Sequence, residues 1–244
     1  MTNSINVVEV FSSIQGEGQC VGYRQVFVRL AGCNLECAFC DTPESRQVVA
    51  EGHMEMTAGK RDFKIISNPL SIATLAGYVN NLLVLPHHSV SLTGGEPLCQ
   101  ADAIAKLAPL INGRIFLETN GTLPFELSIV LPYIDIISMD IKLPSVTGQD
   151  MWQQHGEFLA LANTRTVFVK VVVTKKTSTE EFQQAIDLIT SVNDEIPFII
   201  QPVTPIRDCE GVTPDMVLRW QEQALATLSD VRVIPQTHKF MGQL

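Results

Sequence analysis

The chain has 244 residues, of which 45% are hydrophobic and 18% are charged, and its formal net charge is -9. This composition is that of a folded domain, and the length fits a single α/β domain over residues 1–244. The negative charge gives no general reason to bind nucleic acid or an anionic membrane, and no apolar run approaches the ~20 residues that cross a bilayer. Because the N-terminal segment lacks the pattern of a secretory signal, we expect a cytoplasmic protein without nucleic-acid or membrane partners.

Strands and helices are predicted to alternate along the chain, because short β-branched runs are separated by segments with helical spacing. The predicted strands are 7–14, 25–31, 89–92, 114–117, 135–141, 166–174, 196–202 and 231–234. The predicted helices are 71–85, 98–111, 124–131, 151–162, 179–192 and 213–228. This order predicts a parallel sheet covered by helices, in an open partial barrel of about six strand-helix units.

The stretch 43–69 interrupts this alternation. It is polar, contains glycine and carries three cations, Lys60, Arg61 and Lys64. Long irregular connections in compact domains tend to be functional or mobile, so we predict an insertion or lid here.

Three cysteines, Cys33, Cys37 and Cys40, follow the strand 25–31 with the spacing C-x3-C-x2-C. Thiolates grouped in this way favour zinc, cuprous copper or an iron-sulfur cluster. A structural zinc site takes four ligands, and the remaining cysteines, Cys20, Cys99 and Cys209, show no paired spacing. A zinc-binding interaction module therefore stays as an alternative that lacks its fourth ligand.

Polar residues follow the other predicted strands, and the carboxyl ends of parallel strands meet at one edge of a sheet. After 89–92, Gly94 and Gly95 would let the backbone approach a ligand, and Glu96 could pair with an ammonium group. Further polar positions follow or end the later strands: Glu118, Thr119, Asn120, Ser138, Asp140, Lys142, Lys170 and 201–204. We expect these side chains to share one site.

Arg29 lies within the strand 25–31, and alternation places Val28 and Leu30 on the face opposite to it. If Arg29 faces the interior of the barrel, its charge needs an anionic partner.

The cysteine spacing, with the aromatic Phe39 directly before the last cysteine, resembles the radical S-adenosylmethionine (SAM) superfamily. The segment 93–97, Thr-Gly-Gly-Glu-Pro, resembles the glycine-rich motif of the same superfamily. Segments 13–18, 27–35, 40–42 and 236–239 together resemble the 7-carboxy-7-deazaguanine synthase family within it. The resemblance spans nearly the whole chain, is weakest over 43–69, and places Phe39 where the family often has tryptophan.

This resemblance implies a set of residue roles. Cys33, Cys37 and Cys40 would hold a 4Fe-4S cluster whose open iron binds SAM. The SAM site would be formed by Phe39, Asp41, Gly95, Glu96, Ser138, Met139, Asp140, Gln201, Pro202, Val203 and Thr204. The pterin site would be formed by Ile14, Gln15, Gly16, Arg29, Thr93, His238 and the terminal carboxylate of Leu244. Thr42 would be a ligand of Mg²⁺.

The reaction implied is the ring contraction of 6-carboxy-5,6,7,8-tetrahydropterin to 7-carboxy-7-deazaguanine with loss of ammonia, on the route to queuosine. The resemblance also implies an electron donor such as flavodoxin or ferredoxin, and a homodimer. A glycyl-radical-enzyme activase shares the cysteine spacing and is the alternative within the superfamily. Segments 15–18 and 236–239 argue against it.

Overall fold

The computed structural model describes residues 3–207 and 209–243. Its main sheet has ten strands in the order β12-β11-β10-β9-β8-β7-β3-β2-β4-β5, and β1 (Ser4–Ile5) pairs separately with β6 (Leu70–Ser71). The strands of the main sheet are β2 (Val7–Ile14), β3 (Arg24–Leu30), β4 (Glu51–Glu55), β5 (Phe63–Ser67), β7 (Ser89–Gly94), β8 (Ile115–Thr119), β9 (Ile136–Asp140), β10 (Thr166–Val173), β11 (Phe198–Pro202) and β12 (Val231–Val233).

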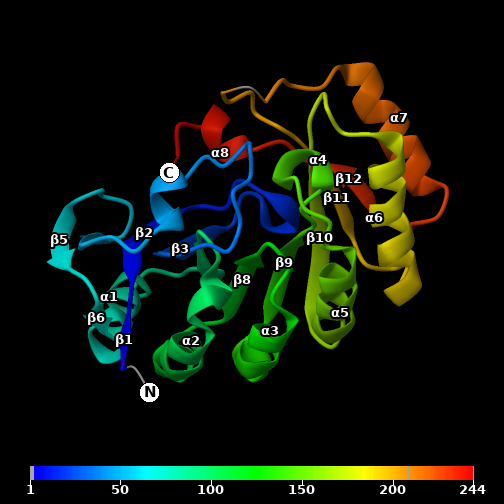
Figure 1. The fold of residues 1–244 in the computed structure, drawn as a ribbon. Coiled ribbons are helices and arrows are strands. Elements are labelled where there is room, and N and C mark those ends of the chain that lie inside the picture. Colours follow the sequence, from blue (N-terminus) through cyan, green and yellow to red (C-terminus); the bar gives the residue numbers. More distant parts are fainter. Residues whose placement is uncertain (1–2, 208, 244) are drawn as a thin grey trace.

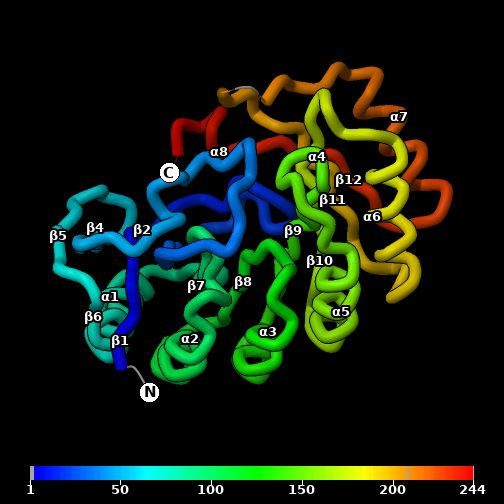
Figure 2. The backbone as a smooth tube through the Cα atoms, viewed as in Figure 1, coloured from blue at the N-terminus to red at the C-terminus, as the bar shows by residue number. Residues whose placement is uncertain are grey.

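Helices follow the parallel strands and lie along one side of the curved sheet, whereas α4 and α8 lie near its carboxyl edge (Figures 1 and 2). The helices are α1 (Ile72–Leu82), α2 (Ala101–Leu107), α3 (Pro124–Val130), α4 (Pro144–Thr147), α5 (Trp152–Ala162), α6 (Thr179–Val192), α7 (Pro214–Leu225) and α8 (Thr237–Phe240). Among the described residues, none of these helices has the length and hydrophobicity to span a bilayer.

The run from β3 to β12 is parallel throughout. The two outer strands of the whole sheet, β12 and β5, do not pair with each other. Five of the parallel strands, β7 to β11, are each followed by one of the main helices, and α1 follows β3 after β4, β5 and β6, so the predicted open barrel of about six strand-helix units is confirmed. β2 runs antiparallel to β3, an orientation that the sequence pattern did not reveal.

Side-chain alternation divides the sheet into two faces. In β10, Val167, Val169 and Val171 belong to the main core beneath the helices, whereas Phe168 belongs to a smaller cluster on the inner face. Lys170 lies on this inner face too, two residues further toward the carboxyl end. The inner face therefore changes from apolar to polar as the strands approach their carboxyl ends.

The stretch 43–69 is not the irregular connection that we predicted. β4 and β5 within it form an antiparallel pair that extends the main sheet next to β2. The hydrophobic pattern did not reveal this pair, because β5 lies at the edge of the sheet: none of its five residues is buried, and Ile65 is exposed. A role as a lid stays a prediction.

Candidate active site

A cavity of about 230 Å³ opens at the carboxyl ends of the parallel strands. Strand register aligns the polar residues that line it. Arg29 pairs with Thr93, Glu118 with Ser138, Asp140 with Lys170, and Val172 with Gln201. Because register partners on neighbouring strands point to the same face, these residues form one continuous inner surface.

The three cysteines of the C-x3-C-x2-C segment all line this cavity, are partly buried, and form no disulfide. Within residues 3–207 and 209–243, no three His, Cys, Asp or Glu side chains converge on the position of a single ion. The other cysteines lie elsewhere: Cys20 and Cys209 are buried in separate apolar clusters, and Cys99 is exposed outside the cavity lining. Three thiols around one cavity fit the donor set of a cluster with an open iron.

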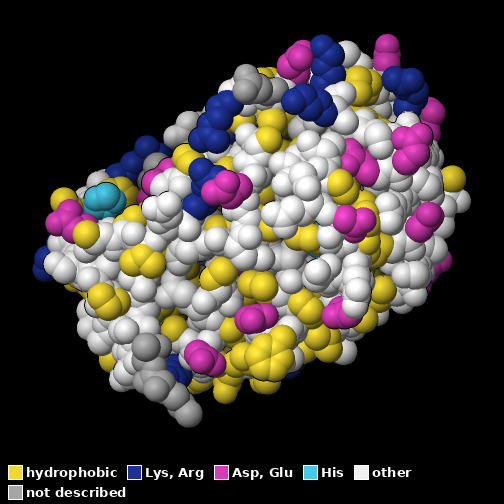
Figure 3. Space-filling model, viewed as in Figure 1, with side chains coloured by type: hydrophobic (Ala, Val, Ile, Leu, Met, Phe, Trp, Pro, Cys, Tyr) yellow, Lys and Arg dark blue, Asp and Glu magenta, His cyan; other side chains and the backbone are white. Residues whose placement is uncertain are grey.

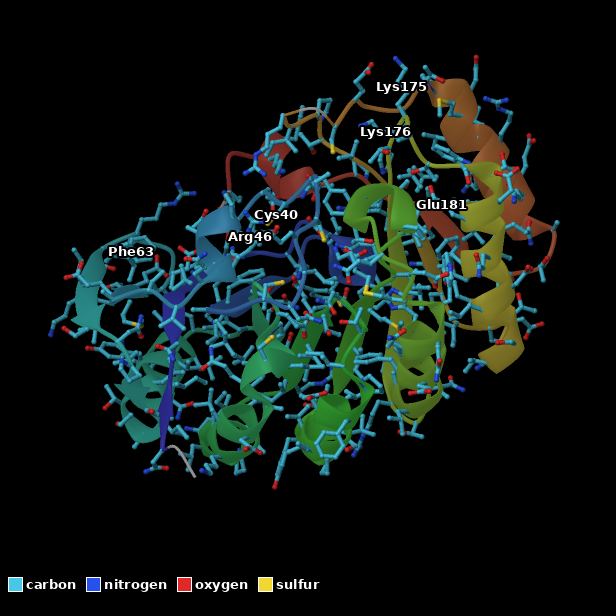
Figure 4. The ribbon with its side chains drawn as sticks, viewed as in Figure 1. Cys40, Arg46, Phe63, Lys175, Lys176 and Glu181 are labelled. Atoms are coloured by element: carbon cyan, nitrogen blue, oxygen red, sulfur yellow. The ribbon has the colours of Figure 1, made fainter. Side chains whose placement is uncertain are left out.

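Backbone hydrogen bonds position the cysteine loop from several sides. The amides of Gly32 and Cys33 donate to Ser45 O and Arg46 O at 2.8 and 3.1 Å, and Ala38 N donates to Val146 O at 3.0 Å. The α4 segment that carries Val146 is held in turn by α6, because Ser145 N donates to Glu181 Oε2 at 3.0 Å. Figure 4 labels Cys40 in the cysteine loop, Arg46 in the segment whose carbonyl accepts from Cys33, and Glu181 in α6.

Gly94 and Gly95 pack directly against the cysteine loop. Gly94 has a φ of +144°, and a side chain there would collide with the backbone of Leu30. A Cβ on Gly95 would lie 2.7 Å from Ser45 O and would also collide with Gly32 O. These positions therefore require glycine so that the two loops can approach each other.

Glu96 is fully buried and accepts hydrogen bonds from Leu98 N, Thr119 Oγ1 and Asn120 N, at 3.0, 2.9 and 2.8 Å. Burial raises its pKa to about 7, although these hydrogen bonds oppose the shift. The carboxyl group thus joins the glycine loop to the loop after β8, in addition to lining the cavity.

Lys170 is the centre of a buried ion network. Its Nζ contacts Glu17 and lies 3.3 Å from Asp140 Oδ2, and Lys142 Nζ lies 2.8 Å from the same oxygen. Burial alone would raise the pKa of Glu17, but Lys170 outweighs it and lowers that pKa to about 2. Burial would likewise lower the pKa of Lys170, yet Glu17 and Asp140 raise it. Glu17, Lys142 and Lys170 are therefore charged at neutral pH.

Two buried acceptors in the cavity lining have no hydrogen-bond partner among the described residues: Asp140 Oδ1 and Gln201 Oε1. Leaving a buried acceptor unpaired costs free energy, so both oxygens are available to donors on a ligand.

Gln15 and Glu118 form a hydrogen-bonded group on the side of the cavity near β2 and β3. Gln15 Nε2 donates to Glu118 Oε1 at 2.7 Å, and Thr93 Oγ1 donates to Glu118 Oε2 at 3.1 Å. Nearby, Arg29 pairs with Glu9 and is about one-sixth exposed. Arg29 thus has the anionic partner that its position required, and it faces away from Val28 and Leu30 as predicted.

The C-terminal segment closes this side of the cavity. Thr237 N donates to Gly16 O at 2.9 Å, and Gln236 Nε2 donates to Glu17 Oε1 at 2.7 Å. Lys239 Nζ lies 3.0 Å from Asp41 Oδ2. Burial and Glu17 would raise the pKa of Asp41, but Lys239 and hydrogen bonds lower it. Residues from the two ends of the chain therefore meet beside Cys40.

The cavity brings together most of the residues predicted from the sequence. Those lining it are Ile14, Gln15, Gly16, Arg29, Cys33, Cys37, Phe39, Cys40, Asp41, Thr42, Thr93, Gly95, Glu96, Ser138, Asp140, Gln201, Val203, Thr204 and His238. Leu244 lies outside the described residues.

Met139 and Pro202 do not line the cavity. Met139 is fully buried in the main core, because alternation in β9 turns it away from Ser138 and Asp140 and toward the helices. Its side chain therefore points away from the cavity, and the same alternation separates Pro202 from Gln201. A contact of either residue with SAM stays a prediction.

Several lining residues had no predicted role. They are Glu17, Glu118, Asn120, Lys142, Lys170 and Gln236. Most belong to the polar strand ends or motifs that the sequence pattern highlighted, so their location could be predicted. Their partners could not, because Glu17 and Lys170 are 153 positions apart.

A family model of the radical SAM superfamily matches residues 28–197. A protein of Geobacter sulfurreducens named 7-carboxy-7-deazaguanine synthase is 45% identical over 97% of this chain and 96% of its own length. A protein of the same name from Archaeoglobus fulgidus is 35% identical over 97% of this chain and 98% of its own length. This chain belongs to the 7-carboxy-7-deazaguanine synthase family of the radical SAM superfamily. Membership implies a 4Fe-4S cluster and SAM as cofactors.

Two solved structures share the fold of this family member. QueE from Escherichia coli aligns with a TM-score of 0.60 at 19% identity, covering 96% of this chain and 94% of that one. A radical SAM methyltransferase from Sphaerobacter thermophilus aligns with a TM-score of 0.60 at 11% identity, covering 93% and 77%. At these identities the likeness concerns the open barrel alone.

Proposed function

We propose that this chain converts 6-carboxy-5,6,7,8-tetrahydropterin to 7-carboxy-7-deazaguanine with loss of ammonia, as a radical SAM lyase in queuosine biosynthesis. One observation carries the proposal: the three cysteines, the Gly-Gly-Glu loop and the 14–17 and 236–238 segments line a single cavity. The cysteines and the glycine loop are general to the superfamily, whereas the other two segments belong to the motifs of the narrower family. The full-length similarity to synthases of this name supports the same assignment.

Cys33, Cys37 and Cys40 would hold the 4Fe-4S cluster. SAM would be held by the predicted SAM residues that line the cavity: Phe39, Asp41, Gly95, Glu96, Ser138, Asp140, Gln201, Val203 and Thr204. When bound, these groups supply the one-electron cleavage of SAM that starts the radical reaction. Asp140 Oδ1 and Gln201 Oε1, both unpartnered, would accept hydrogen bonds from the ligand. Lys170 and Lys142 fix Asp140 through Oδ2, so its other oxygen is held in place.

The pterin would occupy the side of the cavity formed by Gln15, Arg29, Thr93 and His238. Arg29 would bind the substrate carboxylate with its planar guanidinium group. Glu118 is held by Gln15 and Thr93, so its carboxylate is available to N–H donors on the pterin ring. The C-terminal segment, fixed to Gly16 and Glu17, would keep water from this side.

Thr42 would contribute one neutral oxygen to Mg²⁺ through Oγ1, which already accepts a hydrogen bond from Ser45 Oγ at 3.2 Å. A single hydroxyl holds Mg²⁺ weakly, so most ligands would come from the pterin and water.

We also propose a small, acidic electron-transfer protein, such as a flavodoxin or ferredoxin, as the electron donor. Lys and Arg side chains gather along the upper edge of the molecule in Figure 3 although the net charge is -9. Lys175 and Lys176, which follow β10, lie at this edge in Figure 4. We further propose that the protein is cytoplasmic, where thiols stay reduced. We also propose that it forms a homodimer.

Anaerobic incubation with SAM, Mg²⁺, a reductant and the pterin tests the proposal. We expect 7-carboxy-7-deazaguanine by mass spectrometry, with one ammonia per product formed. Because substrate and product differ by ammonia alone, the hydrogen taken from the pterin is returned and SAM is not consumed in proportion to product. Iron and sulfide analysis separates a cluster from zinc. SAM cleavage without conversion of the pterin, combined with glycyl radical formation in a partner protein, would establish the activase alternative instead.

A further inference from the structure

His155 lies in α5 on the helix side of the sheet, outside the cavity lining, and only 1% of it is exposed. Both of its ring nitrogens nevertheless contact loops that lead into the cavity. Nδ1 lies 3.0 Å from Gly121 O, in the loop after β8, and Lys142 N donates to Nε2 at 3.2 Å, in the loop after β9.

These two contacts determine the form of the ring. A backbone N–H can only donate, so Nε2 must be unprotonated and the ring proton must be on Nδ1, where it is donated to Gly121 O. Burial lowers the pKa of His155 to about 4, and Asp140 and Lys142 are the charged groups that face it with opposing effects. The ring is therefore neutral at pH 7 and has one donor and one acceptor on opposite sides.

Each contact leads to residues in the cavity. Beside Gly121, Asn120 N donates to Glu96 Oε2 at 2.8 Å and Asn120 Nδ2 donates to Asn34 Oδ1 at 2.9 Å, next to Cys33. At the other end, Lys142 Nζ lies 2.8 Å from Asp140 Oδ2 and 5.0 Å from the centre of the Phe39 ring. His155 thus joins the two loops whose side chains surround the cysteines.

We propose that His155 is a positioning residue that sets the spacing between the loops after β8 and β9, and thereby the SAM side of the cavity. A histidine that merely stabilised the core would affect both ligands through overall stability. The placement of His155 predicts a selective effect, because neither of its contacts reaches Gln15, Arg29 or Thr93 on the pterin side.

Two matched variants remove one contact each. In His155→Asn the amide nitrogen takes the place of Nδ1, so the bond to Gly121 O remains while Lys142 N loses its acceptor. In His155→Gln the amide oxygen reaches the place of Nε2, so the bond from Lys142 N remains while Gly121 O loses its donor. His155→Phe keeps an aromatic ring and removes both contacts.

We expect each single-contact variant to raise the KM for SAM about tenfold, because an unpaired buried backbone group is costly, and His155→Phe to raise it further. The KM for the pterin should stay within about twofold. Phe182→Leu is the control: Phe182 is fully buried between α6 and β11, so it should lower the melting temperature without changing the KM for SAM. Equal increases in both KM values, or an effect that Phe182→Leu reproduces at equal stability, would overturn the proposal.

A second readout needs no turnover and no cofactor. Nitrogen-15 NMR of histidine-labelled apoprotein, assigned by loss of the signal in His155→Asn, should show a ring protonated only at Nδ1 from pH 6 to pH 8. A ring protonated at Nε2, or at both nitrogens, would overturn the assignment. The kinetic readout rests on the proposed function, but this one does not: failure of wild-type turnover would refute the function and leave the ring form testable.

Discussion

Arg29 and Glu9 face each other across the antiparallel pair of β2 and β3, with 2.7 Å between Arg29 Nε and Glu9 Oε1. Glu9 thus binds the guanidinium group through Nε and leaves its two terminal nitrogens for a ligand. A guanidinium held in this way is oriented before the substrate arrives, and less entropy is lost on binding.

Arg29→Ala should therefore lower kcat/KM for the pterin about 10- to 100-fold, the range expected for loss of a charge-assisted hydrogen bond, while SAM binding changes little. Arg29→Lys should recover only part of this, because lysine lacks the planar fork. Arg24→Ala, on the same strand but exposed and outside the cavity, is the matched control. An equal loss of affinity for both ligands would assign Arg29 a general role instead.

Replacement of Cys33, Cys37 or Cys40 by alanine should each prevent cluster assembly, because two thiolates are too few to hold it. The measurement is iron and sulfide content after anaerobic reconstitution. Cys99→Ala and Cys209→Ala should retain the full content, since neither lines the cavity. A complete cluster and SAM cleavage in any of the first three variants would refute the ligand assignment.

The ion network around Lys170 should make stability depend on pH. The pKa of Glu17 in the folded chain, about 2, lies below its ordinary value of 4.5. Its ionised form thus stabilises the fold above about pH 4.5, and this contribution is lost as the pH falls toward 2. Lys170→Met leaves Glu17 without its ammonium partner and removes one of the two ammonium groups beside Asp140 Oδ2, so it should cost about 3 kcal/mol at pH 7.

Urea unfolding at pH 3.5, 5 and 7 checks this prediction. The deficit of Lys170→Met should shrink at pH 3.5, because protonation then removes the unpaired charge. Lys175→Met breaks the exposed pair with Glu210 and should change little at any pH. A deficit for Lys170→Met that is constant across the three pH values would mean lost packing, not lost charge pairing.

Mg²⁺ should accelerate turnover through a site that includes Thr42. Thr42→Ala should reduce the stimulation, whereas Thr42→Ser, which keeps the hydroxyl oxygen, should preserve much of it. Because metal and substrate share ligands, each should strengthen the binding of the other. Turnover is measured against Mg²⁺ concentration after chelation, and identical curves for the three proteins would remove Thr42 from the metal site.

Gly16→Ala should displace the C-terminal segment. A Cβ added at residue 16 would collide with the side chain of His238. We expect a pterin KM at least tenfold higher and faster proteolysis near residue 238, with the cluster content unchanged. Gly77→Ala in α1, where an added Cβ meets nothing, is the control. Normal pterin kinetics in Gly16→Ala would show that His238 is not needed beside Gly16.

The order of strands and helices could be predicted because apolar periodicity is a local property of the sequence. The position of the site could also be predicted, since parallel strands bring their carboxyl ends to one edge. The resemblance predicts that Met139 contacts SAM, whereas alternation with Ser138 and Asp140 places its side chain on the other face of the sheet. The pairing of Glu17 with Lys170 and the addition of β4 and β5 to the sheet depend on contacts distant in sequence, which no local pattern reveals.

The C-terminal segment contacts residues that lie more than 190 positions earlier in the chain, and this affects folding during translation. Its contacts join Gln236, Thr237 and Lys239 to Gly16, Glu17 and Asp41. During translation the cysteine loop leaves the ribosome roughly 200 residues before these partners, and synthesis at ~10 residues per second makes that a delay of about 20 s. Throughout this time Glu17 and Asp41 lack partners that they have in the folded chain. Delivery of a cluster before the last residues are made would meet cysteines that the C-terminal segment does not yet cover, whereas delivery after release would meet a cavity already closed on this side.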